Sequence, residues 1–577
     1  MLEAAERRDN SLANLRLAVA LVGVAMIWLA LLARVLPPIW LVLPGALYMG
    51  LVFAHGGVLR QRDRLARAVE VYESGLARLT DLWRGQGRTG EEYADEDHLY
   101  AVDLDVVGPG SLFQRISTAR TAPGEETLAR WLLEPEDFES LASRQEAVAE
   151  LRGRLDLRES AALLGDEVSF EISSEQLEDW GGASPVVTST RSAWLAGGVA
   201  GLNVLALVAW WRLPWGSLPL LPALIASGAF VLIWRRRVGA VLAAARHRHR
   251  ELSHFAQLLH FLESETFSAD GLLELQARVR RVGFPASRMV RLLAQLLEWN
   301  ESRRNILFLP IAGLLLLESQ LAFAVERWRA DAGSEAGGWL RAVGEFEALC
   351  SLAAFAFENP DDCFPELEPG AAIFVADGLG HPLLSRASCV RNDLELGGSL
   401  RLLLVSGSNM SGKSTLLRSV GVNAVLAQAG ATVRARRLRI SPLRVGASLT
   451  VGDSLAQGTS RFYAEISRLR AIAALGEASV PLLFLLDEIL HGTNSHDRRI
   501  GAEGVIRSLL AGEGIGLVTT HDLALAEIAE DLGSRAANVH FEDRIDGGRM
   551  VFDYKLRRGV VDKSNALSLM RELGLDV

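Results

Sequence analysis

The chain has 577 residues, a formal net charge of −10 and 49% hydrophobic residues. This length is too great for one compact core, and the acidic balance argues against general electrostatic attraction to nucleic acid. The three cysteines form no CxxC pair and have no histidine at ligand spacing, which argues against a disulfide framework or a zinc site and favours a reducing compartment.

Two uncharged apolar runs near the beginning of the chain predict a membrane hairpin over residues 1–60. Residues 17–33 and 35–54 are separated by the single charge of Arg34. Each run approaches the roughly 20 residues that a helix needs to cross the hydrocarbon core. Buried core helices or a signal peptide are the alternatives, but a second apolar run follows the first where a cleaved signal would be followed by a soluble segment.

A second pair of apolar runs repeats this pattern and predicts another hairpin over residues 191–237. Its runs are 192–211 and 213–234, with Arg212 between them and tryptophans near their ends. Arginines gather outside both hairpins, whereas each turn carries only one. The positive-inside rule therefore predicts an integral protein of a bacterial-type inner membrane, with a cytoplasmic N-terminus and membrane lipid as a partner.

The other segments predict a multi-domain protein with a helical region and a C-terminal α/β domain. Residues 61–190 and 238–365 carry apolar residues at helical spacing. From 366 to 577 the pattern changes to short leucine-rich or β-branched runs separated by glycines, which is typical of alternating strands and helices. The predicted fold class is therefore an α/β domain, an all-α region and four transmembrane helices in two hairpins.

A phosphate-binding loop is predicted where the strand-like run 401–405 meets GSNMSGKST and then a helical stretch. In the G-x-x-x-x-G-K-[ST] pattern, backbone N–H groups and a helix N-terminus face the phosphates of a nucleotide. We expect Lys413 to neutralise the β- and γ-phosphates and Ser414 to bind Mg²⁺. The predicted ATP-binding residues are Gly407, Ser408, Asn409, Met410, Ser411, Gly412, Lys413, Ser414 and Thr415.

Two further strand ends supply candidate catalytic residues. The apolar run 481–486 leads into Asp487 and Glu488, which a central parallel strand would deliver to the ligand-binding edge of the sheet. Asp487 is expected to hold Mg²⁺, and Glu488 to polarise the attacking water. The strand-like run 516–520 ends at His521, which either touches the γ-phosphate or is an ordinary turn histidine.

Taken together, these segments resemble the ATPase domain of the MutS family. SGSNMSGKST, LLDEILHGTNSHD and VTTHD are similar to the phosphate loop, acidic strand and histidine loop of that family, and residues 110–151 are similar to its helical core domain. GDSLAQGTSRFYAEI, residues 452–466, resembles the signature segment, whose serine reaches the nucleotide of a partner subunit. The resemblance implies ATP and Mg²⁺ as ligands, a homodimer formed through a cytoplasmic ATPase domain, and a trans role for Ser460.

The sequence also departs from the family in ways that concern DNA. Arg461 stands where the family usually has threonine, and the acidic pair of the signature is reduced to Asp453. A membrane hairpin stands in place of the mismatch-recognition module, and a second one interrupts the helices that form the DNA clamp of repair proteins. The arginine-rich stretch 434–444 is a candidate for contact with DNA, for attraction to anionic lipid or for a solvated face.

We expect the protein to be a membrane-anchored MutS-like ATPase. An ATPase related to transport is the first alternative, although no LSGGQ-type signature is found and the apolar runs lie within the core-like region. A scaffold that binds nucleotide without hydrolysing it is the second, and the intact Lys413, Asp487 and Glu488 argue against it.

Overall fold

The structure is a computed structural model in which two units are recognised, Met1–Trp83 and Arg84–Val577. The residues that the structure describes are 1–33, 35, 37–134, 138–165, 174–183, 190–244, 249–280, 285–302, 309–408, 410–449, 461–476, 480–490, 493–521, 523–546 and 549–560.

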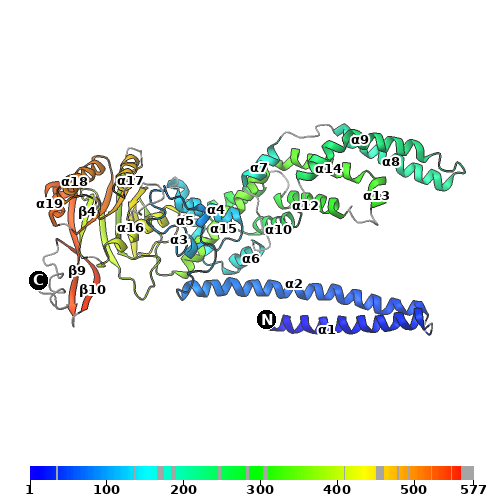
Figure 1. The fold of residues 1–577 in the computed structure, drawn as a ribbon, viewed down its shortest axis with the longest axis horizontal. Helices are drawn as coiled ribbons and strands as arrows, with labels where there is room; N and C mark the ends of the chain where they lie inside the picture. The colour runs from blue at the N-terminus through cyan, green and yellow to red at the C-terminus, as the bar shows by residue number, and fades with distance from the viewer. Residues whose placement is uncertain are drawn as a thin grey trace. The chain divides into compact units, whose positions relative to one another are not determined.

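The first unit is an antiparallel pair of long helices, drawn in blue in Figure 1. α1 (Leu2–Ile27) continues as a short π-helix to Leu32, and α2 (Val42–Leu79) follows the 3₁₀ turn Pro38–Leu41. Buried His55 joins the two helices, because its Nε2 lies 2.6 Å from Asp9 Oδ1 and its Nδ1 lies 2.7 Å from an Arg16 nitrogen.

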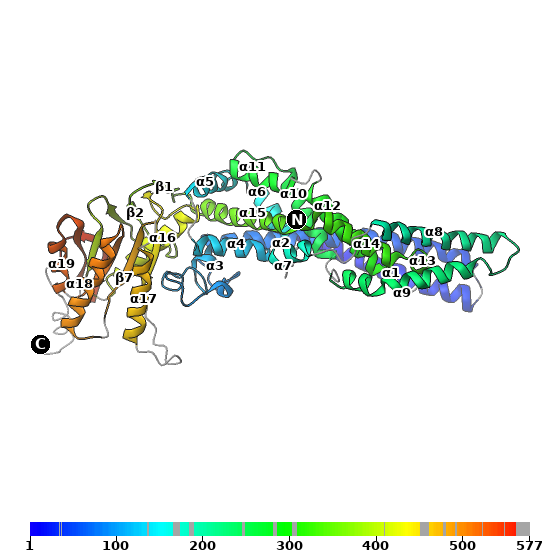
Figure 2. The same cartoon turned by 90° about the horizontal axis from the view of Figure 1, so that it is seen from above.

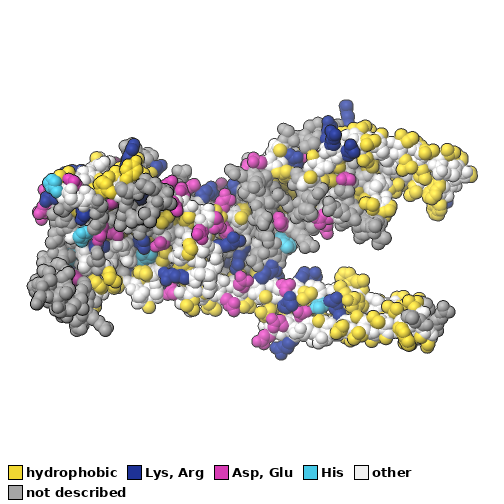
Figure 3. Space-filling model, viewed as in Figure 1, with side chains coloured by type: hydrophobic (Ala, Val, Ile, Leu, Met, Phe, Trp, Pro, Cys, Tyr) yellow, Lys and Arg dark blue, Asp and Glu magenta, His cyan; other side chains and the backbone are white. Residues whose placement is uncertain are grey.

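Three helical segments of the described chain are long and apolar enough to cross a membrane. They are Leu2–Leu31, Ile39–Leu79 and Arg191–Arg212. The predicted apolar runs 17–33, 35–54 and 192–211 overlap these segments. Figure 3 shows hydrophobic side chains covering much of α1, α2 and the pair formed by α8 and α9.

The helix expected over 213–234 begins later than predicted. α9 runs from Leu220 to Ala244, and residues 213–219 form a turn that contains Pro214 and Pro219, which cannot donate a backbone hydrogen bond. α8 (Thr190–Arg212) is joined to α9 through Asn203, which accepts a hydrogen bond of 3.0 Å from Ser227. Its amide group also donates to Leu314 O at 2.8 Å, so α13 (Leu309–Leu314) is bound to this hairpin.

The helical region of the second unit is organised around α15 (Ser334–Glu358), whose side chains are buried along most of its length. α4, α5, α7 and α11 pack around it, as Figures 1 and 2 show. The bounds of these and neighbouring helices are α3 Leu112–Ile116, α4 Ala122–Leu133, α5 Phe138–Arg152, α6 Leu155–Gly165, α7 Ser174–Gly182, α10 His249–Ser264, α11 Asp270–Arg280, α12 Ala286–Ser302, α13 Leu309–Leu314 and α14 Leu317–Trp328.

The C-terminal domain contains two sheets. In the smaller sheet the strand order is β1-β5-β2-β3, and in the larger one it is β10-β9-β4-β8-β7-β6, with the neighbours from β9 to β6 parallel. The bounds are β1 Glu366–Leu367, β2 Ile373–Leu379, β3 Asn392–Gly397, β4 Leu402–Ser406, β5 Arg437–Ile440, β6 Arg444–Ser448, β7 Leu482–Asp487, β8 Ile515–Thr520, β9 Ala536–Asp546 and β10 Arg549–Arg558.

Helices cover both faces of the larger sheet. On one face, α17 (Arg461–Leu475), α18 (Ser495–Ala511) and α19 (Leu523–Leu532) form a buried core with Leu402, Leu404 and their neighbours. α16 (Lys413–Gln428) contacts β6, β7 and β8 and is almost entirely buried. Because side chains alternate along a strand, the apolar strands supply both of these cores.

A buried carboxyl group in the helical region makes its stability depend on pH. Glu347 on α15 is 4% exposed and accepts hydrogen bonds from the backbone and side chain of Thr121, the N-cap of α4. Burial raises the pKa of this carboxyl from 4.5 to about 7. The folded protein thus retains a proton that the unfolded chain releases, so stability falls as the pH rises between these two values.

We predict that Glu347→Gln stabilises the contact between α4 and α15 at pH 8 and has little effect at pH 5. The rise of the Glu347 pKa from 4.5 to about 7 corresponds to a free energy on the order of 3 kcal/mol. Hydrogen exchange of amides in the two helices at both pH values measures it, with Glu335→Gln on the same helix as the control. If Glu347→Gln changed hydrogen exchange equally at pH 5 and pH 8, the raised pKa of Glu347 would be contradicted.

Candidate functional site

Three neighbouring parallel strands bring the candidate residues to one edge of the larger sheet. β4 pairs with β8, and β8 pairs with β7, with Ser406 opposite Thr520 and Asp487 opposite Thr519. Because the three strands run in the same direction, the loop after β4, the residue after β8 and the acid after β7 emerge side by side.

The loop between β4 and α16 depends on glycine at both ends. Gly407 has φ +151°, and a Cβ there would lie 2.8 Å from Ser411 Oγ. Gly412 has φ +107° and stands at the N-cap of α16, where a Cβ would lie 3.1 Å from the ring of Tyr554. Between them, Met410 has φ +72° and an exposed side chain. The loop therefore turns its backbone tightly into the first turn of the helix.

Lys413 is the buried cation of this site. Its Nζ donates to Gly407 O at 2.8 Å and to Ser408 O at 3.1 Å, and lies 3.4 Å from Glu488 Oε1. The lysine is only 5% exposed, so its charge is fixed against the loop and faces the acidic strand end.

The two acids after β7 are held by β8. The Thr519 hydroxyl donates to Asp487 Oδ1 and accepts a hydrogen bond of 3.0 Å from Glu488 N. Glu488 has φ +47°, a left-handed conformation that is uncommon for non-glycine residues. His521 Nδ1 lies 3.7 Å from Glu488 Oε1. A cation, two carboxylates and an imidazole thus converge at one edge.

A cavity of about 670 Å³ opens at this edge. Within the described part of the chain, the Ser408 and Ser411 hydroxyls are buried and have no hydrogen-bond partner. Such orphaned donors are unusual in folded proteins and suit a ligand that supplies acceptor oxygens. The side chains that line the cavity include Leu384, Val390, Asn392, Lys413, Ser414, Thr415, Asp487, Glu488 and Tyr554.

The structure brings most of the predicted site residues together. The described residues Gly407, Ser408, Met410 and Ser411 form the loop, Gly412 to Thr415 lead into α16, and Asp487, Glu488 and His521 lie at the neighbouring strand ends. The predicted residues Asn409 and Ser460, and with them Asp453, lie outside the described residues.

Sequence reasoning missed two residues of this site. Thr519 was part of the run that matches the histidine loop, but nothing in the sequence indicated that its hydroxyl binds the acidic strand end. Tyr554 lies on β10 with φ +53°, where its ring lines the cavity beside Gly412. Its carbonyl accepts a hydrogen bond of 3.0 Å from Asn392, which fixes this part of β10 against β3.

The arginine-rich stretch 434–444 is not an open basic surface. Arg436 pairs with Asp377, Arg437 with Glu366 and Arg439 with Glu368, each across the smaller sheet. Arg434 is 3% exposed. Most of the positive charge that suggested DNA or lipid in the sequence is therefore neutralised by acids from β1, β2 and the chain next to them.

The fold and the site define the class of protein. A buried parallel strand, a glycine-rich loop, a helix that begins with lysine, and an acidic end on a nearby strand are the arrangement found in P-loop nucleotide-binding domains.

Comparison with known proteins identifies relatives of the C-terminal part of the chain. Residues 403–575 match the model of MutS domain V. The DNA mismatch repair protein MutS of Chlorobium phaeovibrioides is 34% identical over 245 residues, which are 41% of this chain and 27% of that protein. MutS of Natronomonas pharaonis is 33% identical over 243 residues, with the same two coverages. The C-terminal part of the chain is therefore similar to MutS proteins, as its motifs predicted, and the match spans about a quarter of the length of these relatives.

The conformation of Gly412 gives a testable prediction. Gly412→Ala should destabilise the C-terminal domain by about 1–3 kcal/mol, because alanine is strained at φ +107° and its Cβ meets Tyr554. Gly504→Ala in α18 is the matched control, since a Cβ there meets nothing within 4 Å and alanine favours the helix. Thermal unfolding of both variants measures the difference; a neutral Gly412→Ala would refute the proposed strain.

Proposed function

We propose that this protein is a membrane-anchored MutS-like ATPase that binds and hydrolyses ATP with Mg²⁺ in a composite site formed by two copies of the chain. The observation that carries the proposal is the placement of Lys413 and Glu488 3.4 Å apart, beside the Asp487 carboxylate and at the mouth of a helix N-terminus. The family match over residues 403–575 supports it independently.

The residues around the cavity fit a nucleotide triphosphate and its metal. The loop amides, the unpartnered hydroxyls of Ser408 and Ser411, and the Lys413 ammonium would hold phosphate oxygens. Ser414 and Asp487 would hold Mg²⁺, which proteins bind through one or two side chains together with substrate phosphates.

In the proposed reaction, residues of the chain position the phosphates and the attacking water, and Glu488 polarises that water. Bound Mg²⁺ would neutralise charge that develops on the phosphates. Glu488 orients and polarises a water molecule for in-line attack, and its backbone is fixed for this by Thr519. His521, 3.7 Å from Glu488, contacts the same region from β8. The ring of Tyr554 lines the cavity beside Gly412, which suits stacking of the base.

Dimerisation and membrane anchoring complete the proposal. The resemblance of residues 452–466 to the signature segment supports a homodimer in which Ser460 completes the site of the partner. The three long apolar helices support an integral membrane protein with a cytoplasmic ATPase domain. The fourth span, over 213–234, belongs to the same proposal. DNA is left out of it, because Arg434 is buried and Arg436, Arg437 and Arg439 are paired.

Replacement of Glu488 tests the proposed activity. We predict that Glu488→Gln in detergent-purified, full-length protein binds ATP with unchanged affinity but hydrolyses it at least ~10²-fold more slowly, because the amide no longer polarises the water. Calorimetry measures binding, and phosphate release measures turnover. Glu530→Gln, an exposed acid on α19, is the control and should match the natural chain. Unchanged turnover of Glu488→Gln would remove its catalytic assignment.

A further inference from the structure

Asp103 is a buried carboxylate from the N-terminal side of the helical region that reaches into the C-terminal domain. The residue is 1% exposed. Its Oδ1 accepts a hydrogen bond of 2.9 Å from Leu449 N, immediately after β6, and its Oδ2 lies 2.5 Å from an Arg468 nitrogen on α17. One side chain therefore contacts both flanks of the stretch of sequence that carries the resemblance to the family's signature segment.

The backbone around Asp103 reaches the helix of the phosphate loop as well. Arg418 on α16 donates to Asp103 O at 3.0 Å and lies 3.4 Å from Asp105. The next residue, Leu104, is fully buried against α16, where a Cβ on Gly421 would lie 2.6 Å from its methyl groups. Glycine at position 421 thus allows the chain around Asp103 to approach α16 closely.

The turn that carries Asp103 is tied equally firmly to the helical region. Phe113 N and Leu112 N of α3 donate to Val106 O and Asp105 O, at 2.9 and 2.8 Å. α3 contacts α15, and Thr118 N just beyond α3 donates to Ser351 Oγ on α15 at 3.1 Å. A continuous path of hydrogen bonds and close packing leads from α16 and α17 through Asp103 to α15.

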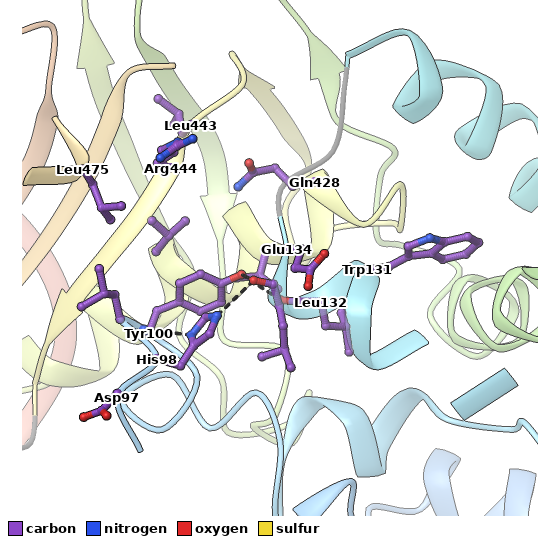
Figure 4. A pocket seen from close by; sticks show the side chains of 14 residues that line it. Asp97, His98, Tyr100, Trp131, Leu132, Glu134, Gln428, Leu443, Arg444 and Leu475 are labelled. Carbon is purple, nitrogen blue, oxygen red and sulfur yellow. Dashed lines mark hydrogen bonds between the residues drawn. The ribbon is translucent and has the colours of Figure 1, made fainter. Parts of the chain in front are cut away.

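A cavity of about 360 Å³ lies between the same parts of the molecule. Figure 4 shows its lining, with His98 and Tyr100 on one side and Gln428, Leu443 and Arg444 on the other. The side chains of Tyr100 and His98 are hydrogen-bonded to carbonyl oxygens at the end of α4. Asp103 joins the two parts beside this cavity, together with other bonds such as the one from Ala447 N to Leu99 O at 2.8 Å.

We propose that Asp103 is a positioning residue that couples the nucleotide site to the helical region. It holds α17 and the end of β6 through its carboxylate and α16 through its carbonyl, so a shift of these elements is transmitted to α3 and α15. This inference rests on the proposed ATPase function. Arg468 is the partner of Asp103 in this role. Its guanidinium binds the Asp103 carboxylate and also donates to Ala447 O at 2.9 Å and to His98 O at 3.1 Å.

The coupling is tested on full-length protein with Asp103→Asn, which keeps the size of the side chain and removes its charge. We predict an ATP affinity within twofold of the natural chain, a kcat lowered about 10-fold, and loss of the ATP-dependent change in hydrogen exchange over residues 98–118. Arg468→Lys, which keeps the charge but not the forked geometry, should give the same pattern more weakly. Glu527→Gln breaks the exposed pair with Arg499 and is the control for loss of an ion pair.

The outcomes separate this inference from the function on which it rests. If the natural chain binds or hydrolyses no ATP, the proposed function fails. If the natural chain is active and Asp103→Asn or Arg468→Lys retains both its kcat and its ATP-dependent exchange pattern, the coupling role is refuted. If these variants only unfold at lower temperature while kcat and the exchange response stay unchanged, the contact is merely structural and the inference is equally wrong.

Discussion

The parallel pairing of β4, β8 and β7 is the constraint on which the candidate site depends. It places three segments that are far apart in the sequence at adjacent positions on one sheet edge, with Asp487 opposite Thr519 and Ser406 opposite Thr520. The short loop after β4 then brings Lys413 to Glu488, and the hydroxyl of Thr519 holds both acids in place. A register slip of one residue in β8 would turn Thr519 to the other face and separate the two acids from their support.

The site also depends on burial. Lys413 is bound by two carbonyl oxygens of its own loop, so the cation has a fixed position inside a poorly solvated region, where interactions between charges are stronger than in water. The helices on both faces of the sheet keep water from the strands, and the chain around Asp103 contributes Leu104 to the packing against α16. The C-terminal domain is thus partly built by residues that precede it by hundreds of positions in the sequence.

The sequence predicted the parts of this protein whose signals are local. A glycine loop between a buried strand and a helix, an acidic strand end and long apolar runs depend on neighbouring residues, and the structure has each of these features. The features that the sequence left open are those set by distant partners. For the stretch 434–444 it could not decide between DNA, lipid and a solvated face, because the paired acids Asp377, Glu366 and Glu368 lie elsewhere in the chain. Tyr554 and Asp103 have no recognisable motif, and the VTTHD motif does not indicate the role of the Thr519 hydroxyl, because the importance of these residues comes from contacts made only after folding.

Calorimetric titration of ATP and Mg²⁺ into the full-length protein and its Lys413→Ala variant tests the nucleotide site most directly. Loss of the buried ammonium should weaken ATP binding at least ~10-fold, or about 1.4 kcal/mol. Lys555→Ala on β10 removes a lysine that binds the Arg391 carbonyl and should leave ATP affinity unchanged. ATP affinity that survives intact in a folded Lys413→Ala protein would show that the triphosphate does not bind between the glycine loop and the acidic strand end.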